Sequence, residues 1–147
     1  MKTLSPEVGY RIEEPAALVP WDIIQDELPK LFPDHSLKRV TDAYHTMCCV
    51  SLSGLTHRLG FHFEKNSPGR LRALELFRDS YPDLNASYDE FQRHLEMTFG
   101  PPHETSPGDE DRPTCAWNFG AVQIVHLIYD RFGPEEHVRL RKTDRSA

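Results

Sequence analysis

Histidine and cysteine are the residue types in this chain with the most specific chemistry, because both bind transition metals and both take part in catalysis. The chain has 8 histidines and 3 cysteines. Zinc sites require ligands at short spacings that face the same way. His57 and His62 are five residues apart in a strand-like stretch, so they face opposite sides, and the adjacent Cys48 and Cys49 diverge likewise. His45 could still join one of these cysteines and a distant ligand, but the spacing predicts no metal ion and no other cofactor.

Nucleophilic catalysis by a cysteine and a histidine needs only that the two side chains meet in space. Cys115 alternates with Trp117 and Phe119, which predicts a buried and unreactive thiol. His126 shares a strand face with apolar residues, which predicts a hydrogen-bonded histidine in the core or at an edge. The chain has no Gly-x-Ser-x-Gly, no phosphate-binding glycine loop and no His-Glu-x-x-His. We therefore expect that the protein is not an enzyme, and an unrecognised enzyme is the least favoured alternative.

The stretch from Pro101 to Pro113 is the strongest indication of a binding site. Its prolines argue against regular secondary structure, and its acids outnumber its single arginine. These acids are Glu104, Asp109, Glu110 and Asp111. A long loop stiffened by proline loses less entropy on docking, and acids steer a basic partner. The alternative is a solvated surface loop without a partner.

A second surface is expected on the stretch from His57 to Glu64. Its apolar residues alternate with polar ones, so Leu59, Phe61 and Phe63 face the core and three polar side chains face outward. The outward residues are Arg58, His62 and Glu64. They are the second candidate contact surface for a protein partner.

Composition limits the class of protein. Hydrophobic residues make up 38% and charged residues 27% of the 147 residues, which is typical of one globular domain over 1–147. The formal net charge of −6 disfavours nucleic-acid binding and favours a basic protein partner. No apolar run approaches the ~18 residues of a membrane helix. The first residues lack the apolar core of a signal peptide, so we expect no membrane contact and a cytoplasmic location.

The secondary-structure elements that would position these residues can be predicted, beginning with the first half of the chain. Residues 1–17 are expected to form an extended arm, and a short helix is expected from Pro20, with Trp21, Ile24 and Leu28 on one side. Three strands follow as a meander over 45–53, 57–64 and 70–78. The third stretch also contains good helix formers, so a helix remains an alternative there.

A central helix is predicted within residues 87–102. Ser87 with Glu90 forms the pattern of a capping box. The apolar stripe consists of Tyr88, Phe91, Leu95 and Phe99. Gly100 and Pro101 end the helix, and Gln92 and Glu96 are expected on its exposed side.

Three more strands are predicted after the central helix, over 114–119, 122–131 and 137–142. The middle one is the most hydrophobic and is expected at the centre of the sheet, whereas the last one carries basic residues and is expected at an edge. Residues 143–147 are expected to be a loose tail. The predicted fold class is α+β. It has an antiparallel sheet of about six strands, strand meanders on either side of the central helix, and a short N-terminal helix.

Three sequence stretches resemble a known family. They are SYDEFQRHLEMTFGPP, CAWNF and VQIVHLIYDRFGPEEHVRLRK. From His45 onward the chain is similar to small bacterial immunity proteins encoded beside secreted polymorphic toxins, and the likeness rests on 99–101, Trp117 and 130–133. A similar order occurs in periplasmic assembly lipoproteins and β-lactamase-inhibitor-like modules, which are secreted, whereas this chain is expected to lack a signal peptide. The resemblance implies a protein that binds a cognate toxin and blocks it, without catalytic residues.

The expected function is therefore that of a toxin-neutralising immunity protein. The acids from Glu104 to Asp111 would enter or cover a basic active-site cleft, and aromatic residues would anchor the contact. A small cytoplasmic adaptor or a secretion chaperone is the alternative, followed by an unrecognised enzyme.

Overall fold

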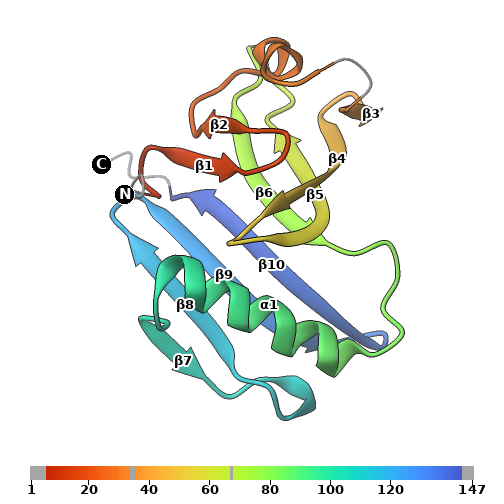
Figure 1. Cartoon of the computed structure of the whole chain (residues 1–147), viewed down its shortest axis with the longest axis vertical. Coiled ribbons are helices and arrows are strands. Elements are labelled where there is room, and N and C mark those ends of the chain that lie inside the picture. The colour runs from red at the N-terminus through yellow and green to blue at the C-terminus, as the bar shows by residue number, and fades with distance from the viewer. Residues whose placement is uncertain (1–5, 34–35, 67, 144–147) are drawn as a thin grey trace.

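The framework of the protein is an eight-stranded antiparallel sheet, seen in a computed structural model that describes residues 6–33, 36–66 and 68–143 (Figure 1). Alternating apolar residues give each long strand one buried side. Across the sheet the strands follow the order β3 (Lys38–Thr41), β4 (Tyr44–Ser51), β5 (Leu55–Phe63), β6 (Leu71–Phe77), β10 (Pro134–Lys142), β9 (Val122–Asp130), β8 (Thr114–Phe119) and β7 (Glu104–Ser106). The α+β class is confirmed, but the predicted number of about six strands is wrong.

The first meander agrees with the prediction in three of its strands. Strands β4, β5 and β6 pair in sequence order, and the stretch that could have been a helix is β6. The additional strand β3 pairs with β4 and forms one edge of the sheet. All four residues of β3 are exposed, so it lacks the apolar alternation that identifies a strand in a sequence.

Strand β10 lies in the middle of the sheet, so its prediction as an edge strand is wrong. It pairs with β9 over its whole length and with β6 through Val138, Arg139 and Leu140. The β7–β8–β9 meander starts at the opposite edge, so its last hairpin brings β10 against the free side of β6. β9 is an interior strand between β8 and β10.

The N-terminal segment is a hairpin rather than the predicted extended arm. β1 (Gly9–Ile12) pairs with β2 (Ala17–Pro20) as a separate two-stranded sheet. The buried side chains of Tyr10, Ile12 and Val19 join the core, which explains why the segment is ordered. Residues 1–5 of the predicted arm lie outside the described part of the chain.

The predicted short helix begins later than expected and is a 3-10 helix, η1 (Gln25–Leu31). Ile23 and Ile24 lie outside the helix, because the Ile23 carbonyl accepts a hydrogen bond from the Leu71 amide and the extended Ile24 forms a bridge with Arg70. Ile23 is therefore buried in place of the predicted Ile24, while Trp21 and Leu28 are buried as expected.

The central helix α1 (Leu84–Phe99) is confirmed, but its predicted start is wrong. Asp83 caps the helix by accepting a hydrogen bond from the Ala86 amide at 3.0 Å, and Ser87 lies inside the first turns. Tyr88, Phe91 and Leu95 are buried as predicted, with Phe99 partly buried against the core. The helix ends at Gly100, whose φ of +85° favours glycine.

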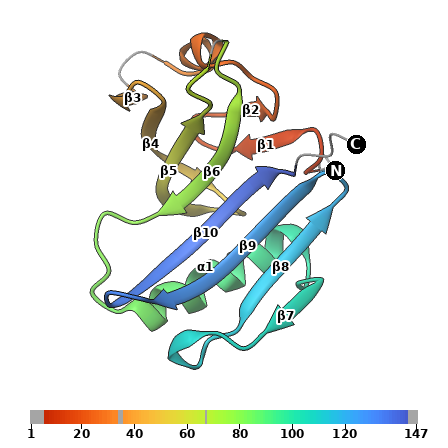
Figure 2. The same ribbon diagram turned by 180° about the vertical axis from the view of Figure 1, so that it is seen from behind.

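Helix α1 and the β1–β2 hairpin cover the same face of the large sheet, and the other face is open (Figure 2). The core lies between these two layers. The predicted loop 101–113 contains β7 and a short 3-10 helix, η2 (Asp109–Asp111), so the expectation of no regular element is wrong. Among the described residues, no helix is long and apolar enough to cross a membrane. Thr143 is the one residue of the predicted tail that the structure describes.

Candidate protein-binding site

All four acids predicted in the 101–113 stretch are exposed, but the structure separates one of them from the others. Glu104 lies on β7 opposite Ala116, and its Oε2 accepts a hydrogen bond from Asn118 at 3.3 Å. Asp109 Oδ2 accepts a hydrogen bond of 2.7 Å from the Asp130 amide, at the end of β9. Ala116 pairs with Val125, so five residues of β9, or about 16 Å, separate the two acids.

Asp109, Glu110 and Asp111 form a fixed turn, which we call the acidic tip. Glu110 and Asp111 have φ values of +60° and +57°, which place both in the left-handed region. Gly108 precedes the tip, and a Cβ atom there would lie 2.3 Å from the Arg112 carbonyl oxygen. The tight approach of the backbone therefore requires glycine at this position.

The base of the acidic tip is fastened to helix α1. Arg112 Nε and Nη2 donate to the two carboxylate oxygens of Asp89 at 2.9 and 3.0 Å, and this contact raises the pKa of Arg112. The Tyr88 hydroxyl donates a hydrogen bond to the Pro113 carbonyl. Tyr88 and Asp89 are adjacent residues about one turn from the start of α1, so both contacts fasten the tip to the same part of the helix. The tip is thus held in one place before any partner binds.

An exposed aromatic residue lies beside the acidic tip. Phe132 is in the turn between β9 and β10, and it is 88% exposed, the highest value among the large hydrophobic residues that the structure describes. The guanidinium carbon of Arg131 lies 5.0 Å from the centre of its ring. Because Asp109 binds the amide of Asp130, this turn and the acidic tip occupy the same end of the molecule. The sequence contained a usable signal, since Phe132 stands between two predicted strands in an Arg-Phe-Gly-Pro turn.

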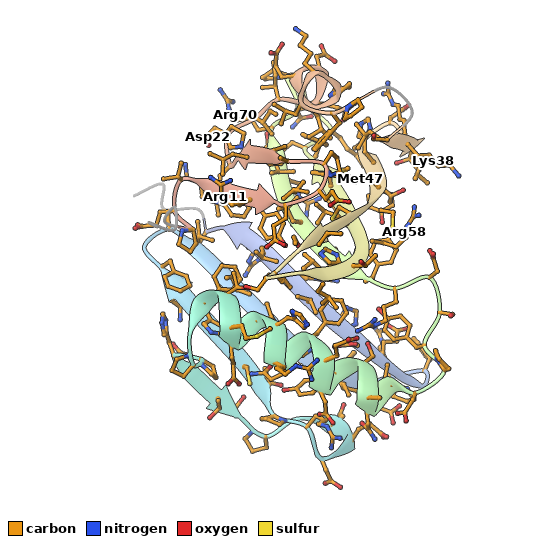
Figure 3. All side chains as sticks on the ribbon, in the orientation of Figure 1. Arg11, Asp22, Lys38, Met47, Arg58 and Arg70 are labelled. Atoms are coloured by element: carbon orange, nitrogen blue, oxygen red, sulfur yellow. The ribbon has the colours of Figure 1, made fainter. Side chains whose placement is uncertain are left out.

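The second predicted surface is on the open face of the sheet, away from the acidic tip. Arg58 extends from β5 at the side of the molecule that also carries Lys38 (Figure 3). Its Nε lies 3.5 Å from Asp79 Oδ1. His62 stacks on Tyr44, with 4.5 Å between the ring centres. Two strands, β6 and β10, lie between β5 and β9 in the sheet order, so these residues cannot join the tip in one small contact.

The His62 imidazole also fixes a carboxylate on the open face. Its Nε2 lies 3.1 Å from Glu75 Oε1, and this hydrogen bond lowers the pKa of Glu75. Glu64 follows the last residue of β5, and its amide donates to the Arg70 carbonyl. The predicted orientation of this strand is confirmed, because Leu59, Phe61 and Phe63 are at most 1% exposed.

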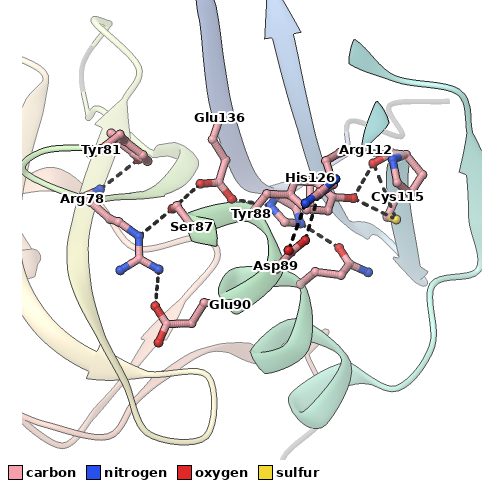
Figure 4. A network of polar contacts seen from close by, with 12 residues as sticks. Arg78, Tyr81, Ser87, Tyr88, Asp89, Glu90, Arg112, Cys115, His126 and Glu136 are labelled. Carbon is pink, nitrogen blue, oxygen red and sulfur yellow. Dashed lines mark hydrogen bonds and ion pairs between the residues drawn. The ribbon is translucent and has the colours of Figure 1, made fainter. Parts of the chain in front are cut away.

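A buried polar network behind the tip was not predicted (Figure 4). His126 Nε2 lies 2.5 Å from Glu136 Oε2, and Ser87 Oγ donates to Glu136 Oε1 at 2.6 Å. Arg78 Nε donates to Ser87 Oγ at 2.6 Å, and Arg78 Nη2 lies 2.6 Å from Glu90 Oε1. The network therefore joins the residue after β6 to α1, β9 and β10.

Solvent does not reach the His126–Glu136 pair at the centre of this network. The side chains of His126 and Glu136 are 0% and 1% exposed. Burial lowers the pKa of His126, and the hydrogen bond with Glu136 opposes that shift. The second ring nitrogen, Nδ1, lies 2.7 Å from Gln92 Oε1, so both nitrogens are engaged. The prediction that His126 is a hydrogen-bonded core residue is confirmed.

A second buried cluster contains serine, histidine and cysteine under the N-terminal hairpin. Ser51 Oγ lies 2.6 Å from His57 Nε2 and 2.5 Å from the Tyr10 hydroxyl, and Cys49 Sγ lies 3.9 Å from the same histidine nitrogen. Ser51 is 0% exposed. Within 6–33, 36–66 and 68–143, no group of three or more His, Cys, Asp or Glu residues is arranged to hold a metal ion.

Comparisons with known proteins give one structural likeness. No protein-family model matches the chain, and no curated protein matches it. The crystal structure of a DUF4309 family protein (YjgB) from Bacillus subtilis subsp. subtilis str. 168 is similar at 13% identity, with a TM-score of 0.41. The similarity covers 82% of this chain and 78% of that one. A likeness at this level carries no argument about function.

Proposed function

We propose that this protein binds a partner protein through the acidic tip and Phe132, and that it is an immunity protein that blocks a secreted toxin. The observation that supports the proposal is the joint position of three carboxylates and an 88% exposed aromatic ring on one fixed end of the molecule. Aromatic residues are enriched among the side chains that dominate binding energy. Acids around such an anchor favour a partner with a basic surface.

The mechanism is occlusion of a basic cleft. Phe132 would bury its ring in the partner, while Glu110 and Asp111 would face cationic side chains at the cleft. Because Arg112 and Tyr88 already hold the base of the tip, the tip loses little conformational entropy when it docks. The proposed location is the cytoplasm of a bacterium that makes the toxin.

The test begins with the partner isolated by co-purification, whose binding to purified variants is then measured at several salt concentrations. We expect Phe132→Ala to weaken binding by about 30-fold, mainly through faster dissociation. The matched control is Met97→Ala, which truncates a 55% exposed side chain near the other end of α1 and should leave binding unchanged. Equal affinity of the Phe132 variant and wild type would refute the anchor.

Charge is tested by the double variant Glu110→Gln and Asp111→Asn. We expect slower association and a weaker dependence on salt, because exposed charges act mainly on encounter. The control is Glu14→Gln with Asp26→Asn, which removes the same charge from exposed residues near the N-terminus. An equal response of both double variants would assign the effect to net charge.

The immunity function has a separate readout, the survival of cells that express the partner. Co-expression of wild-type protein should restore growth, and Phe132→Ala should restore it less. A partner that is harmless alone, or that depends on this protein for export, would instead favour the adaptor or secretion chaperone.

A further inference from the structure

A broad groove on the open face of the sheet is the second feature that can bind a partner. It encloses about 1040 Å³ and extends over β6, β10 and β9, on the side toward the viewer in Figure 2. Strand pairing places Arg139 opposite Val125 and His137 opposite Leu127, with all four side chains on this face. Val125 and Leu127 are half-buried and form an apolar floor.

The groove carries a charge opposite to that of the whole protein. Five cationic residues line it, namely Arg72, Arg131, Arg139, Arg141 and Lys142. Two acidic residues line it, Glu64 and Glu135, so the formal balance is 5 − 2 = +3 with histidine neutral. The chain as a whole has a net charge of −6. An anionic ligand is therefore attracted to this face in particular.

Three of these arginines are not held in a close ion pair, although Arg139 lies opposite Glu75 of β6 and helps His62 to lower the pKa of that carboxyl. Lys142 already pairs with Asp22 at 3.2 Å, and Arg131 lies against the Phe132 ring. Within the part of the chain that the structure describes, Arg72, Arg139 and Arg141 form no ion pair within 4.0 Å. Arg139 and Arg141 alternate along β10 and are exposed. A guanidinium binds a carboxylate through two parallel hydrogen bonds, so such a row suits spaced carboxylates.

We propose that this groove binds an extended, acidic segment of a partner protein that also carries apolar side chains. The carboxylates of the segment would pair with Arg72, Arg139 and Arg141, and its apolar side chains would cover Val125 and Leu127. The face is distinct from the acidic tip, and its charge is opposite, so the proposal goes beyond the function proposed above. The two sites adjoin only at Phe132, which also borders the groove.

A protein segment fits this groove better than a nucleic acid does. Single-stranded nucleic acids bind on sheets through aromatic rings that stack on successive bases. Between the arginines the floor is aliphatic, formed by Ala73, Val125 and Leu127, and the exposed rings of Tyr129 and Phe132 lie only at the end of the groove next to the β9–β10 turn.

The experiment measures binding of a fluorescent peptide of about ten residues in which glutamate alternates with leucine, long enough to follow β10. We expect saturable binding that weakens as salt rises. Arg139→Gln with Arg141→Gln should lower the affinity by about tenfold or more. The control Arg11→Gln with Arg93→Gln removes the same charge from exposed residues on β1 and α1, and it should bind like wild type.

Other probes identify what the groove recognises. Peptides with glutamine in place of glutamate, or serine in place of leucine, should bind at least about tenfold more weakly. The proposal is overturned if wild type binds the acidic peptide with a Kd above about 1 mM, or if the serine peptide binds equally well. Tighter binding of an oligothymidine would assign the groove to nucleic acid instead. Self-association that the arginine double variant abolishes would assign it to a second copy of this chain.

Folding and the acidic tip are controlled separately. The melting temperature of each variant is measured first, and the single variant Arg72→Gln replaces the double variant if the latter does not fold. Phe132→Ala and the Glu110/Asp111 variant are measured with the isolated partner, whereas wild type and the arginine variants are measured with the peptide. Unchanged partner binding by the tip variants, with normal peptide binding by wild type, would contradict the proposed function alone. Weakened partner binding by the tip variants, without peptide binding by wild type, would contradict the groove alone.

Discussion

Single residues in this protein take roles that depend on their neighbours in space. Ser87 and Glu90 form the pattern of a helix cap, yet Ser87 donates to Glu136 in the core and Glu90 pairs with Arg78. Asp83 is the actual cap. A hydroxyl group forms a hydrogen bond with whichever partner lies closest in the fold. Here that partner is Glu136, which belongs to a strand 49 residues further along the chain. The pattern alone therefore could not distinguish the two roles.

The three cysteines differ in exposure, so we expect them to differ in reactivity. Cys48 is exposed on β4, whereas Cys49 and Cys115 are 3% and 2% exposed. Burial raises the pKa of Cys49 to about 12, which keeps its thiol protonated. We expect a maleimide to label one thiol in the native protein and all three after denaturation, as measured by intact mass. Cys48→Ser should remove the native label, and its persistence in that variant would contradict the burial of the other two thiols.

Helix α1 is the element that connects the two halves of the sheet. It buries Tyr88, Phe91 and Leu95 against the sheet, and its C-terminal carbonyl at Gly100 accepts a hydrogen bond of 2.8 Å from Trp117 Nε1. His94 Nδ1 lies 2.8 Å from the Leu52 carbonyl oxygen, which fastens the helix to the β4–β5 turn. The helix is therefore held by packing and by two contacts in its C-terminal half.

The apolar stripe of α1 should carry much of the stability. Phe91 and Leu95 are both 0% exposed, so Phe91→Ala or Leu95→Ala should lower the free energy of unfolding by about 2–5 kcal/mol. Glu96→Ala, on the exposed side, should stay within about 0.5 kcal/mol. Urea denaturation measures the differences. If Phe91→Ala unfolds at the wild-type midpoint, the helix does not contribute its buried face to the core.

Gln92 behaves differently from the prediction that it lies exposed on the helix. Its Oε1 is 2.7 Å from His126 Nδ1, a buried atom that would lose its partner in Gln92→Ala. We expect this variant to lower the free energy of unfolding by about 1–3 kcal/mol, because an unpaired buried polar group is costly. Gln92→Glu retains an acceptor and should cost less. The same urea titration, compared with Glu96→Ala, measures both, and equal stability of all three variants would contradict a structural role for the contact.

The stability of the whole molecule depends on pH because several histidines are buried in the core. His45, His57 and His126 come from three different strands and are at most 4% exposed. Burial lowers the pKa of each, so the folded protein binds a proton less readily than the unfolded chain, whose histidines titrate near 6.5. Their contribution to stability is complete above that value and is lost as the pH falls below it.

We therefore expect the free energy of unfolding to decrease between about pH 6.5 and about pH 5.5. Each histidine contributes at most about 1.4 kcal/mol per pH unit. Urea titrations at several pH values give the slope, and His57→Gln should reduce it by the share of one histidine. Glu75, whose pKa is lowered by His62, adds a loss of the same sign at more acidic pH. Greater stability at pH 5.5 than at pH 7.5 would contradict this assignment.

Residue patterns in the sequence are enough to predict which residues face inward and where most strands and the central helix lie. Strand β8 has the predicted limits, and the burial of Leu59, Phe61 and Phe63 follows directly from their alternation. The exposure of the acidic residues was also predictable, because prolines and charges keep their stretch at the surface. Such features are local, and the side-chain period of a helix or strand is enough to reveal them.

Which strands are neighbours in the sheet is visible only in the folded molecule. β10 looks like an edge strand because its outward residues are basic, yet it pairs with β6 and β9, and those same arginines line the open groove. Phe132 and the acidic tip meet because the Asp130 amide binds Asp109 across 21 residues of chain. The backbone hydrogen bonds between two strands are almost the same whichever side chains the strands carry. The sequence of one strand therefore does not identify the strand with which it pairs. Pairing is instead selected by how all the buried faces pack at once.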